Sequence, residues 1–186
     1  MNRFHRWYCR TGAWRRTVRE RLLPWVLAGV ELGDDVLEVG PGPGLTTDVL
    51  RARVPHLTSI EIDPALARTL RDRLPGGNVT VVEGDATAMP FGDAAFTGAV
   101  ACTMLHHVPS AALQDRLLAE VHRVLRPGAW FAGSDSTPSL LFRAAHVFDT
   151  MVLVPPDSFA ERLRRVGFHD VRVEHAPGAF RFQARR

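Results

Sequence analysis

Lysine is absent from this chain of 186 residues, so all 23 basic residues are arginines. We interpret the arginine bias mainly as a consequence of GC-rich codons and only secondarily as a functional choice. The net charge is +3, and acids and bases are interspersed after the N-terminal segment. This balance does not demand a nucleic-acid partner, and we expect none.

Cysteine and long apolar runs are also scarce. Cys9 and Cys102 are the only cysteines, and their separation matches no metal site, so we expect no metal. Few cysteines are typical of a reducing compartment, which predicts a cytoplasmic location. No apolar run approaches the about 20 residues of a membrane span, and no secretory signal follows the start.

What the chain does contain is enough apolar material for a full core. Hydrophobic residues make up 46% of the sequence, which excludes a disordered chain. The length suits one domain, which we place at residues 32–186. Residues 1–31 precede it as a separate helical segment.

The N-terminal segment is rich in arginine and aromatic residues. Residues 1–19 contain six arginines and no acid, and Trp7 and Tyr8 lie among them. Pro24 should kink the helix or begin a second one that runs to Val30. One apolar face recurs at helical spacing and consists of Trp14, Val18, Leu22 and Trp25.

Three interpretations of this segment compete. It can be a helix that packs on the domain and covers the active site as a lid, a helix in weak contact with a membrane surface, or an organelle-targeting peptide. The apolar face continues directly into the domain at Leu32. This continuity favours the first interpretation.

Residues 36–47, VLEVGPGPGLTT, are the stretch around which the domain is organised. Residues 36–39 indicate a short buried strand, and three glycines then indicate a tight turn before a helix. Glycine adopts positive φ and allows the backbone to approach a ligand closely. Taken alone, the turn could also be an ordinary loop.

The glycine spacing distinguishes two kinds of nucleotide site. A dinucleotide site requires G-x-G-x-x-G, whereas this chain has G-x-G-x-G with Glu38 two residues before the first glycine. The pattern E-x-G-x-G-x-G resembles the first motif of the class I S-adenosylmethionine (SAM)-dependent methyltransferases. SAM has no phosphate and carries a sulfonium and an amino group, so an acid near the turn is favourable.

Beyond the turn, the patterns of strands and helices alternate, which indicates a parallel sheet covered on both faces. We expect strands at residues 36–39, 57–62, 79–82, 95–102, 129–134, 171–174 and 179–183, and helices at 45–53, 64–74, 113–124 and 158–166. A capping box of Ser158 and Glu161 should begin the last helix. Pro177 and Gly178 should join the last two strands as an antiparallel hairpin.

This order resembles the methyltransferase fold over residues 32–186. The resemblance implies an α/β, three-layer Rossmann-like sandwich with a seven-stranded, mostly parallel sheet in the order 3-2-1-4-5-7-6 and an antiparallel last strand. The runs LHHV at 105–108 and VLRPGA at 124–129 resemble the small-molecule branch, including the quinone-biosynthesis type. One departure is Thr97, which follows Phe96 where the family commonly has an acid, and it should change local hydrogen bonding.

The resemblance also implies a SAM site at the carboxyl ends of the strands. Glu61 matches the acid that accepts from the ribose hydroxyls, and Asp85 matches the acid at the adenine end. Cys102 and Thr103 end the fourth strand, where family members offer carbonyls to the methionine ammonium. The predicted cofactor-binding residues are Glu38, Gly40, Pro41, Gly42, Gly44, Glu61, Ile62, Gly84, Asp85, Ala86, Cys102 and Thr103.

The predicted reaction is methyl transfer from SAM to a small molecule, with S-adenosyl-L-homocysteine (SAH) as product. The enzyme mainly aligns the acceptor and excludes water. If the acceptor is a hydroxyl or phenol, His106 or His107 is the nearest candidate base. Without that role, the two would be a solvated histidine beside a packed one.

Residues 137–156 add a mostly apolar stretch that the sheet does not need. They either cover the sheet edge or, as in related methyltransferases, help build an acceptor pocket with the N-terminal helix. We therefore predict a largely hydrophobic acceptor, such as a quinone, polyketide, phenol or lipid-like molecule, between residues 7–14 and 148–151. The alternatives are a non-catalytic SAM-binding or scaffold protein and an NAD-linked reductase, which the glycine spacing disfavours.

Overall fold

The computed structural model describes residues 11–137 and 151–186. The strands are β1 Asp35–Val39, β2 His56–Glu61, β3 Val79–Glu83, β4 Phe96–Cys102, β5 Leu125–Ser136, β6 His169–Ala176 and β7 Ala179–Arg185. The helices are α2 Gly12–Thr17, η1 Val18–Leu22, α3 Leu23–Val26, α4 Leu45–Leu50, α5 Pro64–Arg73, η2 Leu105–His107, α6 Ala111–Val124 and α8 Pro156–Arg165. None of the helices in these two ranges has the length and apolar character required to cross a membrane.

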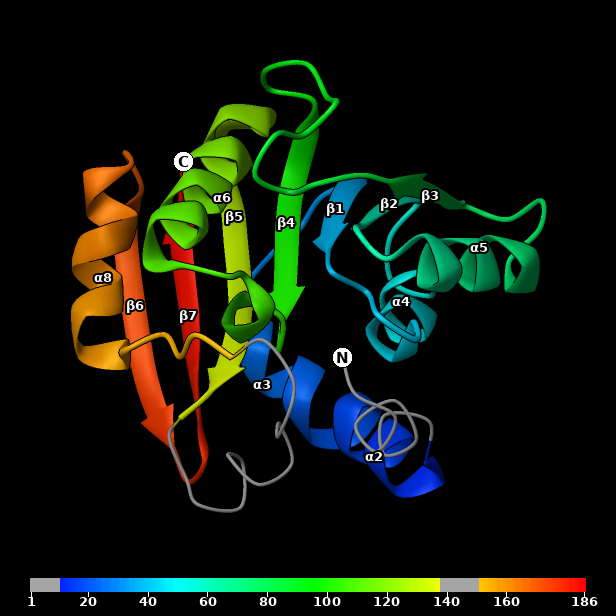
Figure 1. Ribbon diagram of the computed structural model, residues 1–186, viewed down its shortest axis with the longest axis horizontal. Helices are drawn as coiled ribbons and strands as arrows, with labels where there is room; N and C mark the ends of the chain where they lie inside the picture. Colours follow the sequence, from blue (N-terminus) through cyan, green and yellow to red (C-terminus); the bar gives the residue numbers. More distant parts are fainter. Residues whose placement is uncertain (1–10, 138–150) are drawn as a thin grey trace.

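The strands form one sheet in the order β3-β2-β1-β4-β5-β7-β6, and the helices lie around it (Figure 1). The pairs from β3 to β5 are parallel, whereas β7 runs antiparallel to both β5 and β6. The predicted seven-stranded order and the antiparallel last strand are confirmed. The strand order reverses between β1 and β4, which is where such sheets open a crevice.

Two hydrophobic clusters flank the sheet because alternate strand residues point to opposite faces. Leu37 and Ala101 belong to the cluster that contains the buried side chains of α6 and α8. Val36 and Val100 belong to the cluster on the other face, with residues of η1, α3 and α4. The predicted three layers follow from this alternation.

The described part of the N-terminal segment forms a continuous helical run that contains one π-helical turn, η1. The amide of Leu23 donates to the carbonyl of Val18, five residues earlier. Pro24 lies in the first turn of α3, where its missing N–H is not needed. Helix α3 begins at Leu23 and continues η1 without a break, so the predicted second helix from Pro24 to Val30 does not form. The helical segment ends at Val26, shortly before Gly29 at positive φ.

This helical segment packs on the sheet. Val18, Leu23 and Val26 are buried in the same cluster as Val36. Gln183 of β7 donates its side-chain amide to the carbonyl oxygens of Val26 and Ala28, at 2.8 and 3.0 Å. Residues 18–26 therefore share the core of the domain, while residues 1–10 lie outside the described ranges.

The prediction of a capping box at Ser158 is wrong. Helix α8 begins at Pro156, and no side chain caps it. The hydroxyl of Ser158 instead donates to the carbonyl of Pro155 at 3.3 Å, and Glu161 pairs with Arg165 at 3.0 Å. Proline is preorganised for the first helical position, so Pro156 starts the helix earlier and places Ser158 inside it.

The predicted hairpin is confirmed, and the bonds of Thr97 are defined. The last strands form an antiparallel hairpin in which Ala176 pairs with Ala179. The Thr97 hydroxyl accepts from the amide of Asp35 at 3.0 Å and donates to the carbonyl of Asp35 at 3.1 Å. Thr97 therefore uses its hydrogen bonds to tie β4 to the start of β1.

Candidate active site

A pocket of 380 Å³ lies at the carboxyl ends of the parallel strands β1, β2, β3 and β4. This volume is in the range of small-molecule sites. The segments that follow each of these strands line it, and helices η1 and α6 supply further walls. It therefore occupies the crevice at which the strand order reverses.

Most predicted site residues meet in this pocket. Those that line it are Gly40, Pro41, Gly42, Glu61, Ile62, Gly84, Asp85, Ala86, Cys102, Thr103 and His107. Glu38, Gly44 and His106 are not among the lining residues. The lining residues that the sequence analysis did not assign to the cofactor site or the base are Pro43, Leu45, Thr46, Ile60, Asp63, Leu66, Thr87, Met104, Val108, Pro109, Leu113 and Leu117.

The glycine turn presents its backbone to the pocket. Gly42 has φ +55°, and a Cβ atom built on it would meet no atom within 4 Å. Gly44 has φ +83°, and its Cβ would lie 2.4 Å from Leu70 Cδ1. Gly42 thus leaves open space for a ligand, whereas Gly44 allows α4 and α5 to approach each other behind the turn.

Glu61 is buried at the end of β2 and holds the turn in place. Its Oε2 accepts from the amide of Gly42 at 3.0 Å, and its Oε1 accepts from the amide of Asp63 at 2.9 Å. Each carboxylate oxygen retains a second lone pair, so Glu61 can still accept from a pair of ligand hydroxyls. Asp85 lies after β3 and accepts from the amide of Thr87 at 2.8 Å. The open turn and the two acids fit a ligand with a diol and an amino-substituted base.

Glu38 lies beneath the turn and is 2% exposed. It accepts hydrogen bonds from the hydroxyls of Thr46, Thr47 (2.6 Å) and Ser59 (2.7 Å). Burial raises the pKa of Glu38, and the three hydroxyl bonds oppose that shift. The structure therefore gives Glu38 the task of anchoring the first turn of α4, outside the pocket itself.

Cys102 and Thr103 carry the chain from β4 into the pocket. Burial raises the pKa of the Cys102 thiol to about 12, so this sulfur stays protonated and is a poor nucleophile at neutral pH. Thr103 has φ +52°, and its amide donates to the carbonyl of Ser134 at 2.8 Å. Positive φ is strained for a threonine, and strain of this kind gathers at ligand sites.

The two adjacent histidines have different surroundings. His106 is 1% exposed, its Nδ1 lies 2.5 Å from Oδ1 of Asp135, and its amide donates to Oδ2 of Asp135 at 3.0 Å. His107 lines the pocket, and its ring centroid lies 4.2 Å from that of His106. Of the two predicted bases, only His107 reaches the pocket.

The remaining pocket walls are apolar. Trp14, Val18 and Leu22 of the N-terminal helices line one side, and Leu113 and Leu117 of α6 line another. The predicted acceptor-binding residues Trp7 and Phe148 lie outside the described ranges, and Met151 is not among the lining residues. Trp14 is thus the part of that prediction that the pocket contains.

Known proteins resemble the chain at the level of sequence and of fold. The family model described as a methyltransferase domain matches residues 37–133. The ribosomal RNA small subunit methyltransferase A of Bordetella pertussis is 33% identical over 143 residues, which are 68% of this chain and 52% of that protein. The O-methyltransferase cnsE of Penicillium expansum is 34% identical over 154 residues, 76% of this chain and 54% of that protein.

The chain spans about half the length of these curated relatives. Among solved structures, a methyltransferase of Haloferax volcanii in complex with the Trm112 methyltransferase activator superposes with a TM-score of 0.73 at 17% identity. That superposition covers 100% of this chain and 98% of the Haloferax chain. At this identity the likeness concerns the fold.

Proposed function

This chain belongs to the SAM-dependent methyltransferases, and from that premise we propose that it methylates a small, largely hydrophobic acceptor. SAM supplies an electrophilic methyl group on a sulfonium. The observation that supports a hydrophobic acceptor is the set of apolar walls that Trp14, Val18, Leu113 and Leu117 add to the cofactor crevice. Apolar walls also exclude water, which protects the transfer.

In this proposal the polar half of the pocket holds the cofactor. Glu61 accepts from the ribose hydroxyls, Asp85 accepts from the adenine amine, and the open backbone at Gly42 admits the methionine part. The carbonyls near Cys102 and Thr103 receive the ammonium group. Glu38 contributes indirectly because it anchors the helix that follows the turn.

His107 is the proposed base for a hydroxyl or phenol acceptor, because it is the histidine that lines the pocket. A histidine is partly neutral near pH 7 and can take the acceptor proton as the methyl group moves. The buried His106 and Asp135 support the turn on which His107 stands.

The test is a panel of quinols, phenols and fatty acids with radiolabelled SAM, run with the wild type, His107→Ala and His56→Ala. His56 is exposed at the amino end of β2, away from the pocket, and is the matched control. We expect turnover of a phenolic acceptor to fall by about 10²-fold or more in His107→Ala, with SAH affinity and the His56→Ala rate unchanged. Equal rates for both variants would remove His107 as the base, and SAM binding without transfer to any acceptor would favour a non-catalytic protein.

A second candidate is methylation of RNA. It is favoured by the ribosomal RNA methyltransferases among the relatives and by exposed arginines on the helices that line the pocket, which are Arg15, Arg16, Arg19 and Arg21. Small-subunit ribosomal RNA in the same assay separates the candidates. Phosphate contacts would make RNA binding fall steeply with salt, and methylated RNA without methylated small molecules would replace the first proposal.

Two further predictions concern the setting of the enzyme. The low cysteine content supports a cytoplasmic location. A weak contact of the arginine-rich N-terminal segment with a membrane surface is consistent with a lipid-like acceptor. Sedimentation with anionic phospholipid vesicles at low and high salt tests that contact.

A further inference from the structure

Gln114 is a buried amide directly behind one wall of the pocket. It lies on α6 between the lining residues Leu113 and Leu117 and is 1% exposed. Burial of an amide is unfavourable unless its polar atoms find partners. The partners of Gln114 therefore indicate what this side chain holds together.

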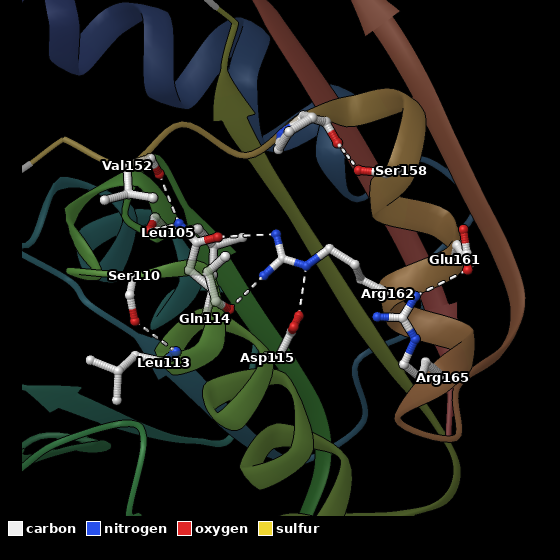
Figure 2. Close-up of polar contacts among 12 residues, drawn as sticks. Leu105, Ser110, Leu113, Gln114, Asp115, Val152, Ser158, Glu161, Arg162 and Arg165 are labelled. Carbon is white, nitrogen blue, oxygen red and sulfur yellow. Dashed lines mark hydrogen bonds and ion pairs between the residues drawn. The ribbon is translucent and has the colours of Figure 1, made fainter.

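The side-chain amide of Gln114 bonds to Leu105 of the histidine turn η2, to Val152 and to Arg162 of α8 (Figure 2). Its Nε2 donates to the carbonyl of Leu105 at 3.1 Å and to the carbonyl of Val152 at 2.7 Å. Its Oε1 accepts from Nη1 of Arg162 at 3.0 Å. One side chain thus joins η2, the segment at residue 152 and helix α8.

The segment at Val152 also bonds directly to the turn. The amide of Val152 donates to the carbonyl of His106 at 2.8 Å. Val152 is therefore held through its amide by η2 and through its carbonyl by Gln114. Gln114 thus holds the carbonyl of Leu105, and Val152, itself held by Gln114, holds the carbonyl of His106. Together these bonds fix the backbone on both sides of His106, the residue before His107.

Arg162 keeps the Gln114 amide in this orientation. Its Nε donates to Oδ1 of Asp115 at 2.6 Å, its Nη2 donates to the carbonyl of Ala111 at 3.1 Å, and its guanidinium lies over the ring of Phe159. Because Arg162 can only donate, it must face Oε1 of Gln114, and the Nε2 donors are directed to the two carbonyls. Figure 2 shows the guanidinium between Gln114 and Asp115.

We propose that Gln114 is a positioning residue for methyl transfer, which acts by fixing turn η2 and hence the orientation of His107 in the pocket. The inference deepens the proposed function and depends on it for the role of His107. Catalytic groups lose much of their effect when they are displaced by about 1 Å. Residues that fix the turn therefore control the rate without touching the ligand.

Two variants and one control test the proposal. Gln114→Leu removes all three bonds, and Gln114→Glu keeps a partner for Arg162 but places a carboxylate against two carbonyls. The control is Asn78→Leu, because Asn78 also donates its amide to two backbone carbonyls, those of Arg51 and Val54 at 2.8 Å each, at the amino end of the sheet. Gln114→Glu retains the side-chain shape, so it serves if Gln114→Leu does not fold.

The first measurement is proton NMR of the imidazole C–H signals with SAH bound, in which His107→Ala identifies the His107 signals. We expect the His107 signals and their pH titration to move in both Gln114 variants and to stay in place in Asn78→Leu. The second is turnover of the acceptor from the panel, where kcat should fall about tenfold or more while SAH affinity stays within twofold.

The results separate the two proposals. His107 signals that coincide with those of the wild type in both Gln114 variants would overturn the positioning role, as would SAH affinity that falls in parallel with kcat. Full activity of His107→Ala would instead overturn the proposed base. In that case the NMR measurement still decides whether Gln114 orients the turn.

Discussion

Glu38 and Glu61 are both buried carboxylates at the carboxyl ends of neighbouring strands, yet their partners differ. Glu38 receives three hydroxyl groups and lies behind the turn. Glu61 receives two backbone amides and lines the pocket. Glu61 thus holds the turn and also faces the pocket, where we predict that it binds the cofactor, whereas Glu38 anchors α4 behind the turn.

Replacement of Glu61 should affect the cofactor more than the fold. We expect Glu61→Ala to weaken SAH binding by about 1.5–3 kcal/mol, because hydrogen bonds to a charged group are lost. Isothermal titration calorimetry measures the affinity, and Glu83→Ala, at an exposed position at the end of β3, is the control. Unchanged affinity in Glu61→Ala would exclude Glu61 from the site.

Glu38 should make stability depend on pH. Its pKa is raised in the folded state by burial, so the folded state holds this proton more tightly than the unfolded state does. The stability that Glu38 adds by binding this proton is fully present at pH values below its ordinary pKa of 4.5. It is lost as the pH rises through the raised pKa of the folded state. The melting temperature should therefore fall less between acidic and neutral pH in Glu38→Gln than in the wild type. A parallel pH dependence of the two proteins would contradict this.

The sequence patterns identified the pair His106 and His107 but not their separate tasks. The two residues are adjacent in a short turn, and the buried one, His106, contacts Asp135, which comes from the distant strand β5. The same holds for Gln114, whose partners come from three separate parts of the chain. Local patterns contain no information about such distant partners.

At the scale of elements, the strands and the first glycine turn were predictable because their signals are local. Helix α5 begins at Pro64, the first residue of the predicted helix 64–74, and the Asp63 carboxylate caps it by accepting from the amides of Ala65 and Leu66. The π turn of η1, which directly precedes α3, was not predicted. Strand β5 begins at Leu125, before the predicted residue 129, because Phe96 pairs with Leu125.

The centre of the sheet has no room for a side chain at Gly133. A Cβ there would lie 2.1 Å from the carbonyl oxygen of Ala101 and 2.3 Å from the Phe182 ring. We expect Gly133→Ala to lower the free energy of unfolding by about 1–3 kcal/mol or more through overpacking. Gly77→Ala, where no atom lies within 4 Å of the built Cβ, is the control in urea denaturation. Equal stability of the two variants would contradict the expected overpacking.

At the scale of the whole molecule, the family resemblance predicted the order of the strands in the sheet. It did not predict which residues of the N-terminal helices pack against the sheet. The division into a lid at residues 1–31 and a SAM-binding domain at residues 32–186 stays a prediction. The burial of Val18, Leu23 and Val26 beside Val36 indicates how the described part of this segment should respond to unfolding.

We expect the helices at residues 18–26 to unfold together with the sheet, because they share one hydrophobic cluster. In native-state hydrogen exchange, the amides of this segment should then be protected to the same degree as those of β1 and β4. Early exchange of residues 18–26 with an intact sheet would show a lid that opens separately. Gln183→Leu removes the bonds to Val26 and Ala28. The amides of residues 18–26 should therefore exchange earlier, relative to those of the sheet, in this variant than in the wild type.

Ile62 is 67% exposed at the rim of the pocket and is the one large hydrophobic side chain that residues 11–137 and 151–186 leave exposed. A bound cofactor at Glu61 and Asp85 would cover it together with the apolar walls. Removal of apolar surface from water gives a negative change in heat capacity. The enthalpy of SAH binding should therefore become more favourable as the temperature rises, and this slope should be smaller in Ile62→Ser.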